Sequence, residues 1–555
     1  MSHDPAPSPG SPPAPPVAPA TAASRRYSFL LVALGLTVAA VAGVWTLLPE
    51  TVDQGSRLML SFLLVLALLV ATAAWFFFLG RFAGRTRAIG AVLIAFVVVP
   101  LFGSIRRVEF SGDMIPTFDM RWHADRNTAL EAHRAQQAAE AKTGVAEVQP
   151  AAQVTHPANW DVLEYRGVNR DGVVDGPRLA RDWSATPPKL VWRQPVGGGY
   201  AGFVVQGPQV ITIEQRRDRE AIVSYDFDTG RERWVYEYPA LFHETLGGDG
   251  PRATPTIADG KVYSLGATGV LACLDLNTGK ELWSLNVLQQ NSAGNLQWAM
   301  SGSPLIYENR VLVNPGTQLS TGKSFAVTAF DAANGQPLWG GGETQAGYTS
   351  PMWATLGGMR QILIFDGVGL AGYDPADGRE LWRSPWKSDF DINAAQPIVV
   401  DDQRVLITSA AGAALVRVAQ ADGRWTAEEI WRNRKLKGGY TCPIAYEGFV
   451  YGIDESILVC LEIETGKLRW KDRGGQYGHG QMLRSGDLLV VLAESGELAL
   501  VELSSEKFRE LGRIQAIKGK TWNNPTLVGG RIFVRNHLEM AAYDLPLAEP
   551  PAEQK

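Results

Sequence analysis

Long apolar runs fill the N-terminal fifth of the chain, and short alternating runs of apolar and polar residues fill the rest. Residues 27–48 and 58–79 carry no charge and are largely apolar, and their lengths are close to the roughly 20 residues that a helix needs to cross a bilayer. Residues 88–105 form a third uncharged run that contains Pro100. We therefore expect three transmembrane helices over these ranges.

The arginines around these runs predict their orientation. Basic residues gather before the first run and between the second and third, at Arg25, Arg26, Arg81, Arg85 and Arg87. Short loops rich in arginine stay in the cytoplasm, so three spans place everything after residue 105 on the far side, although Arg106 and Arg107 oppose this orientation.

The segments beside the predicted spans are expected to lack a fold of their own. Residues 1–26 are rich in Pro and Ala and are predicted to be a disordered cytoplasmic tail, since they cannot bury enough apolar surface. Residues 106–158 are predicted to be a linker, and residues 546–555 a tail.

A repeated ten-residue pattern that ends in Trp organises the larger part of the chain. Five clear copies read YDFDTGRERW, LDLNTGKELW, FDAANGQPLW, YDPADGRELW and LEIETGKLRW, closing at Trp234, Trp283, Trp339, Trp382 and Trp470. A weaker copy closes at Trp431, and a detached KLVW ends at Trp192. The steps between these tryptophans are typical of four-stranded propeller blades.

Each copy predicts a strand, a tight turn on Asp or Asn and Gly, and a strand whose Trp packs between neighbouring blades. The inner strands of the blades are expected to begin near eight positions: Tyr200, Arg252, Ser301, Tyr348, Ala394, Tyr440, Tyr477 and Trp522. The sequence thus predicts an all-β, eight-bladed propeller over residues 159–545. Residues 189–195 (KLVWRQP) supply the outer strand that the last blade lacks, and this pairing would close the ring.

The D-x-x-x-G-x-x-x-W repeat resembles that of quinoprotein-type propellers, which include PQQ-dependent dehydrogenases and the outer-membrane assembly lipoprotein BamB. The segment WDVLEYRGVNRDG at residues 160–172 is similar to the lead-in of PQQ-binding-like repeat proteins, with Tyr165 in place of the usual Phe. The resemblance implies a quinoprotein-type propeller in the bacterial periplasm, held at the inner membrane by the three predicted helices.

Charge and composition exclude several other classes of function. Residues 1–109 hold eight of the 52 basic and four of the 57 acidic residues, so the remainder has a net charge of −9, which argues against a nucleic-acid partner. The three cysteines are too scattered for a disulfide framework or zinc site. The sequence contains neither an H-E-x-x-H motif nor a G-x-S-x-G motif. Their absence argues against a metallohydrolase and against an acyl-transfer serine.

The eight inner-strand positions also predict a site. Five of them are aromatic, at Tyr200, Tyr348, Tyr440, Tyr477 and Trp522. In a propeller these positions fall where loops enter the central channel, so we expect a ring of aromatics at its mouth. Further candidates in the same loops are Arg252, Trp298, Asn393, His479 and Asn523, with Asp249, Asp389, Asp391 and Lys437 nearby. Packing between blades is the alternative role of these aromatics.

Two functions remain open. The first is a platform, as resemblance to BamB implies, that binds a protein or polysaccharide at the channel mouth. The second is a dehydrogenase of alcohols or sugars, as resemblance to the quinone enzymes implies, with PQQ stacked on Trp298 or Trp522, a Ca²⁺ ion, and Asp249, Asp389 or Asp391 as base. The adjacent Cys-Cys pair of many such enzymes is absent, and the platform is the favoured hypothesis.

Overall fold

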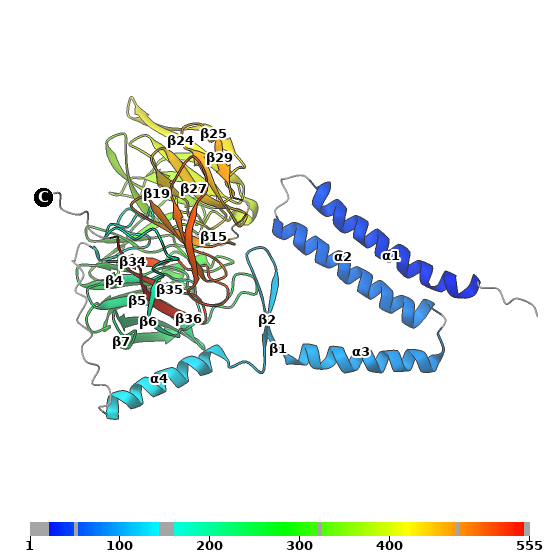
Figure 1. Ribbon diagram of the computed structural model, residues 1–555. Coiled ribbons are helices and arrows are strands. Elements are labelled where there is room, and N and C mark those ends of the chain that lie inside the picture. The colour runs from blue at the N-terminus through cyan, green and yellow to red at the C-terminus, as the bar shows by residue number, and fades with distance from the viewer. Residues whose placement is uncertain are drawn as a thin grey trace, which may run out of the picture. The chain divides into compact units, whose positions relative to one another are not determined.

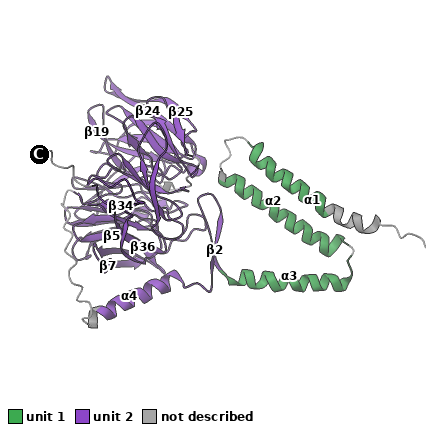
Figure 2. Ribbon diagram, viewed as in Figure 1, with its two compact units in different colours: residues 1–105 green, residues 106–555 purple. Residues whose placement is uncertain are grey.

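The chain divides into two compact units, residues 1–105 and residues 106–555 (Figure 2). The structure is a computed structural model that describes residues 21–48, 54–80, 82–143, 160–318, 325–472, 474 and 477–548. Residues 1–20 of the predicted tail over residues 1–26, residues 144–158 of the predicted linker and residues 549–555 of the predicted C-terminal tail lie outside the described residues.

The first unit consists of helices. They are α1 (Thr21–Thr46), α2 (Gln54–Ala74), which continues as the π-helical turn η1 (Trp75–Leu79), and α3 (Gly84–Ser104). Helices α1 and α2 are in contact, since the Trp45 indole donates to Ser61 Oγ at 3.2 Å. Helix α1 begins at Thr21, within the predicted tail, and α3 begins at Gly84, so Arg85 and Arg87 lie in its first turn.

Two segments of the described residues are long and apolar enough to cross a membrane. These are Gly55–Leu79 and Gly84–Ser104, whereas the apolar part of α1, Leu30–Thr46, is shorter. The structure therefore supports two of the three expected spans by length and composition.

The second unit begins with elements that the sequence analysis expected to be a linker. Strands β1 (Ile105–Phe110) and β2 (Pro116–Met120) form a hairpin, and helix α4 (Arg126–Thr143) follows (Figure 1). The Asp125 carboxylate starts α4, because its Oδ1 accepts the backbone N–H groups of Asn127 and Thr128.

Eight antiparallel four-stranded sheets form the propeller, as predicted. The strands of blades 1 and 2 are β4 (Val204–Gln206), β5 (Gln209–Arg216), β6 (Arg219–Asp226) and β7 (Glu232–Pro239), then β8 (Thr256–Ala258), β9 (Lys261–Leu265), β10 (Val270–Asp275) and β11 (Glu281–Asn286). Those of blades 3 and 4 are β13 (Leu305–Tyr307), β14 (Arg310–Val313), β16 (Val327–Asp331) and β17 (Pro337–Gly341), then β18 (Met352–Leu356), β19 (Met359–Asp366), β20 (Gly369–Tyr373) and β21 (Glu380–Pro385).

The second half of the ring continues the same order. Blades 5 and 6 contain β22 (Ile398–Val399), β23 (Arg404–Ser409), β24 (Gly412–Ala421) and β25 (Arg424–Asn433), then β26 (Ile444–Tyr446), β27 (Phe449–Asp454), β28 (Ile457–Glu462) and β29 (Leu468–Lys471). Blade 7 contains β30 (Gln481–Ser485), β31 (Leu488–Leu492), β32 (Glu497–Glu502) and β33 (Glu510–Gln515). Blade 8 contains β34 (Thr526–Val528), β35 (Arg531–Arg535), β36 (Glu539–Asp544) and β3 (Lys189–Pro195).

Shorter elements lie in the connections between strands. They are α5 (Val287–Gln290), the two-stranded pair β12 (Ala293–Gly294) and β15 (Thr317–Gln318), and the 3₁₀ turn η3 (Asp389–Asp391).

The repeat register is correct with one constant offset. Every inner strand, from β4 at Val204 to β34 at Thr526, begins four residues after the position predicted from the sequence. The eight predicted positions therefore lie in the loops that lead into the inner strands.

The Trp and Gly of the repeat form one contact between neighbouring blades. The ring of Trp234, at the edge of blade 1, lies on the turn glycine Gly279 of blade 2, and its Nε1 donates to Leu276 O at 2.9 Å. The same ring-on-glycine contact joins Trp192 to Gly230, Trp283 to Gly335, Trp339 to Gly378 and Trp431 to Gly466. An added Cβ at any of these glycines would lie closer than 3.0 Å to the ring, and each glycine has a positive φ.

The predicted closure of the ring is confirmed. Strand β3 pairs antiparallel with β36, from Lys189 opposite Asp544 to Pro195 opposite Glu539. The Trp192 indole then donates to Phe227 O of blade 1 at 3.2 Å. One apolar cluster also joins Val205 and Val210 of blade 1 to Phe533 and Ala542 of blade 8, whose strands adjoin in Figure 1. The three cysteines are buried and free, as expected.

Deletion of Lys189–Pro195 from the full chain should expose the edge of β36 and cause aggregation, because the last blade would lack its outer strand. Size-exclusion chromatography and thermal unfolding would measure the effect. Trp192→Phe, which keeps the strand but removes the indole hydrogen bond and reduces the ring contact with Gly230, is the matched control and should remain soluble. A deleted chain that is as soluble and as cooperative as the parent would contradict the role of β3.

Candidate functional site

A cavity of about 320 Å³ lies at the end of the propeller channel where the predicted ring is found. Seven of the eight predicted ring positions line it: Tyr200, Arg252, Ser301, Tyr348, Ala394, Tyr440 and Trp522. Trp298 joins them. The aromatic side chains contact one another around the wall, with ring centroids 5.2 Å apart for Tyr200 and Trp522 and 5.9 Å apart for Trp298 and Tyr348.

A chain of hydrogen bonds runs from blade to blade one layer further into the channel, two residues after the ring positions. In blades 1 to 5, the backbone N–H at this level donates to the side chain at the same level of the next blade. Gly202 donates to Thr254 at 2.9 Å, and Thr254 donates to Ser303 at 3.0 Å. The chain continues through Ser350, Gln396 and Cys442. The N–H of Cys442 then donates to Gln481, which lies four residues after Tyr477. The repeat therefore holds the ring positions of neighbouring blades in register.

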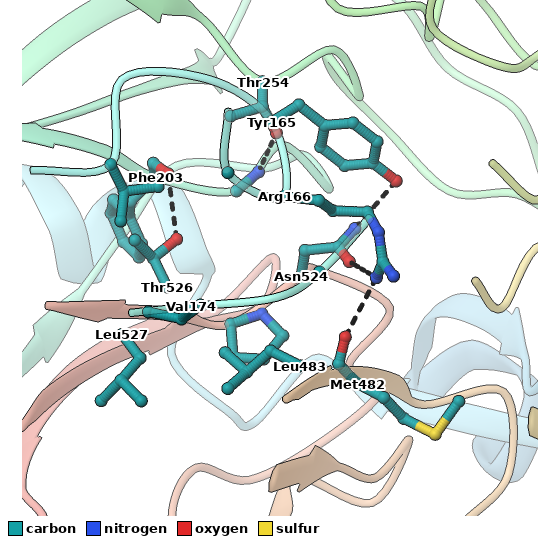
Figure 3. A pocket seen from close by; sticks show the side chains of 15 residues that line it. Tyr165, Arg166, Val174, Phe203, Thr254, Met482, Leu483, Asn524, Thr526 and Leu527 are labelled. Atoms are coloured by element: carbon teal, nitrogen blue, oxygen red, sulfur yellow. Dashed lines mark hydrogen bonds between the residues drawn. The ribbon is translucent and has the colours of Figure 1, made fainter. Parts of the chain in front are cut away.

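The lead-in segment that precedes the propeller crosses the channel and forms the inner end of the cavity. Tyr165 lines the cavity, and its hydroxyl accepts a hydrogen bond from Asn524 Nδ2 at 3.2 Å. Arg166 donates to Asn524 Oδ1 and to Met482 O (Figure 3). Arg170 is buried and donates to three carbonyls of blades 3 and 4, Ser303 O, Pro304 O and Pro351 O.

The tip of the β1–β2 hairpin, residues 111–115, occupies part of the channel mouth. Ser111, Gly112 and Met114 line the cavity. The Gly112 N–H donates to Glu494 Oε1 at 2.7 Å, and a Cβ at this glycine would clash with the rings of His479 and Tyr440. Only glycine therefore fits at this point of the tip.

Acid–histidine pairs attach the hairpin to the propeller. Asp113 of the tip accepts from Ser456 Oγ at 2.7 Å and lies 3.6 Å from His479 Nε2. Burial lowers the pKa of His479, but the Asp113 hydrogen bond and the Glu494 charge outweigh burial and raise it. Glu109 lies 3.2 Å from His537 Nε2. Burial raises the pKa of Glu109, but His537 and nearby cations outweigh it, so the pKa falls to about 2.

Asp249, a candidate catalytic base, instead binds three side chains. It pairs with Arg107 of the hairpin, with Arg126 of α4 at 2.7 Å and with His243 at 2.5 Å. Burial raises the pKa of Asp249, but Arg126, His243 and Arg107 lower it to about 2. A carboxylate held ionised in this way is poorly matched to proton abstraction at neutral pH.

Arg252 is the charged side chain among the described residues that line the cavity. Its guanidinium donates to the backbone carbonyls of Gly247, Gly248 and Gly250 and forms no salt bridge with any described residue. Burial lowers its pKa. Two more donors of the wall, the Tyr440 hydroxyl and the Trp522 Nε1–H, are buried without a hydrogen-bond partner in the described part of the chain.

Several predicted site residues lie outside the lining. Tyr477 is fully buried among apolar side chains and donates to Glu510 at 2.6 Å. His479 stacks on Tyr440 behind the wall, with ring centroids 4.9 Å apart. Asn393 and Asn523 are buried and donate to loop carbonyls. The remaining candidates outside the lining are the acids Asp389 and Asp391 and the amine of Lys437, which pairs with Glu455.

The sequence analysis missed the hairpin and Tyr165 as parts of the site. A signal for the hairpin was present, since residues 105–120 hold two short strand-like runs on either side of a Ser-Gly-Asp turn. No comparable signal placed Tyr165 in the channel.

Comparisons with known proteins agree with this architecture. The family model described as outer membrane protein assembly factor BamB matches residues 218–472. A quinone alcohol dehydrogenase subunit of Komagataeibacter europaeus is 31% identical over 118 residues, which is 20% of this chain and 16% of that protein. BamB of Xanthomonas campestris pv. campestris is 34% identical over 91 residues, 16% of this chain and 21% of that protein.

Among solved structures, quinohemoprotein alcohol dehydrogenase from Comamonas testosteroni superposes with a TM-score of 0.52 at 14% identity, over 76% of this chain and 86% of that one. This likeness shows the fold. The chain matches only about a fifth or less of the length of the two curated relatives above. The comparisons therefore bear out the resemblance to quinoprotein-type β-propellers, since parts of the propeller match both the BamB family model and a quinone alcohol dehydrogenase subunit.

Proposed function

We propose that this chain is a membrane-anchored binding platform whose propeller lies in the periplasm and whose binding site is the cavity at the channel mouth. The observation that carries the proposal is the wall of this cavity, where aromatic side chains from several blades converge around unpaired hydrogen-bond donors. The hairpin tip fills part of the mouth. A protein or polysaccharide partner would therefore contact the rim, and a small molecule would occupy the cavity beneath it.

The dehydrogenase alternative requires a site for PQQ and Ca²⁺. Trp298 and Trp522 offer aromatic faces for a planar ring. Ca²⁺ takes oxygen ligands, above all carboxylates, yet no Asp or Glu of the described residues lines the cavity. The described residues also contain no group of three His, Cys, Asp or Glu side chains placed to hold a metal. The residues of this wall do not fit a Ca²⁺-bound quinone and favour the platform.

The membrane anchor in this proposal consists of three spans. Two described segments are long and apolar enough, and α1, which contacts α2, would supply the third. Arg85 and Arg87 at the start of α3 favour a cytoplasmic position for that end. The two arginines that opposed this orientation have partners in the second unit, since Arg106 pairs with Asp119 and Arg107 with Asp249.

Alanine substitutions at one repeat position should separate binding from packing. Tyr348 lines the cavity, whereas Tyr477, its equivalent in blade 7, is fully buried. Tyr348→Ala should cost about 1 kcal/mol of stability and weaken binding of 2-naphthamide, a neutral aromatic probe, by about tenfold. Calorimetry and thermal unfolding of the full chain in detergent would measure both effects.

Tyr477→Ala is the matched control and should cost about 3–5 kcal/mol, as should Trp283→Ala at a blade contact. Trp522→Ala and Tyr440→Ala should behave like Tyr348→Ala. If all of these variants unfold alike, the ring aromatics are structural and the proposed site fails.

The proposed topology predicts the activity of fused reporters. Alkaline phosphatase fused after Leu545 should be active, because it folds only outside the cytoplasm, and the same reporter fused after Phe82 should be inactive. An inactive phosphatase after Leu545, together with an active cytoplasmic reporter there, would mean an even number of spans.

Addition of Ca²⁺ should leave binding of PQQ to the full chain unchanged, because the cavity wall offers no carboxylate to the ion. Absorption spectroscopy and calorimetry with and without Ca²⁺ would test this expectation. A Ca²⁺-dependent increase in PQQ affinity of tenfold or more would contradict the platform and restore the dehydrogenase hypothesis.

A further inference from the structure

We propose that the ligand of the cavity is a small organic anion, with an aromatic or apolar body and one carboxylate-like group that binds Arg252. This inference rests on the proposed function and names the chemical class of its ligand. Three features of the site support it: an unneutralised cation, unpaired donors, and an aromatic wall of limited size.

Among the described residues, no carboxylate forms a salt bridge with the Arg252 guanidinium. The two acids whose charges act on it are Glu244 and Asp249. Glu244 accepts the Gly247 N–H, and Asp249 pairs with Arg107 and Arg126. The three carbonyls that accept from Arg252 hold its guanidinium in place and do not neutralise it. A buried charge without a partner is costly, and an anionic ligand would remove that cost.

Two other polar groups of the wall lack a hydrogen-bond acceptor, and a ligand would have to supply it. The Tyr440 hydroxyl and the Trp522 Nε1–H lack acceptors among the described residues. The neighbouring amides are already occupied, since Gln481 donates to Tyr440 O and Asn524 bonds to both Tyr165 and Arg166. A buried donor without an acceptor destabilises the folded state. A ligand with oxygen acceptors would satisfy both donors.

A second cation strengthens the positive potential at the mouth. The Lys520 amine lies 4.2 Å from the Trp522 ring centroid and donates to Phe110 O of the hairpin. It forms no salt bridge with the described residues, and burial lowers its pKa. Glu109 and Glu494 partly offset the charge of Lys520, and Glu109 also lies beside His537.

Size and surface define the body of the ligand. The cavity, at about 320 Å³, is at the small end of the roughly 300–1,000 Å³ typical of small-molecule sites. Its wall is formed mainly by Tyr200, Trp298, Tyr348, Tyr440 and Trp522. These aromatic side chains would pack against a ligand whose body is one or two fused rings or a short branched chain. One anionic group of that ligand would pair with Arg252.

A pair of isosteric probes tests the inference. Binding of 2-naphthoate and of its neutral amide, 2-naphthamide, is measured by calorimetry on the full chain in detergent, with heats of titration into matched detergent subtracted. A charge-assisted hydrogen bond contributes about 1.5–3 kcal/mol, so the carboxylate should bind at least about tenfold more tightly than the amide. In Arg252→Met the two affinities should become equal.

Tyr440→Phe provides a second variant in case Arg252→Met is unstable, since it removes a hydroxyl that bonds to no described residue. This variant should keep the melting temperature and bind 2-naphthoate several-fold more weakly than the wild type. Equal affinity of the wild type for both probes, or a preference for the carboxylate that survives in Arg252→Met, would overturn the anion inference while the cavity remained a binding site. Failure of both probes to bind would overturn the proposed site itself.

Discussion

The pairing of β3 with β36 is the interaction on which the rest of the propeller depends. Five of the contacts between neighbouring blades are made by a Trp ring that lies on a turn glycine. A row of blades has two open ends unless a strand from one end completes the other. The seven residues of Lys189–Pro195 complete blade 8, and Trp192 then makes the same contact with Gly230 of blade 1. Closure therefore leaves no sheet edge between first and last blades.

Closure also determines where the preceding segments of the chain lie. Because β3 is the outer strand of blade 8, the segments just before it start at the rim of the ring. The lead-in segment runs into the channel, where Arg166 and Arg170 bond to backbone carbonyls of blades 3, 4, 6 and 7. Helix α4 packs along the ring, where His133 bonds to Gln194 of β3. The ends of the cavity thus come from segments outside the repeat, and its wall comes from the repeat.

This division explains what the sequence could and could not predict. The D-x-x-x-G-x-x-x-W copies predicted the blades, the closing strand and the register of the ring, because identical local patterns form identical blades. The hairpin and α4 could not be assigned in this way, since their positions depend on single long-range pairs such as Arg107 with Asp249. Repeat register alone also could not separate Tyr348 from Tyr477. The two share a position, but Tyr477 reaches Glu510 between strands whereas Tyr348 faces the cavity.

Arg252 is the ring residue that propeller geometry does not explain. The other seven positions of its register hold neutral residues, namely four Tyr, one Ser, one Ala and one Trp, so the fold accepts small and large uncharged side chains there. A cation at this level loses hydration and gains backbone carbonyls and the ring faces of Tyr200 and Phe242, but no salt bridge with a described residue. Related propellers include both an assembly factor and dehydrogenases, and fold alone does not decide between such roles. The charge at Arg252 therefore distinguishes this ring from one that the repeat alone would build.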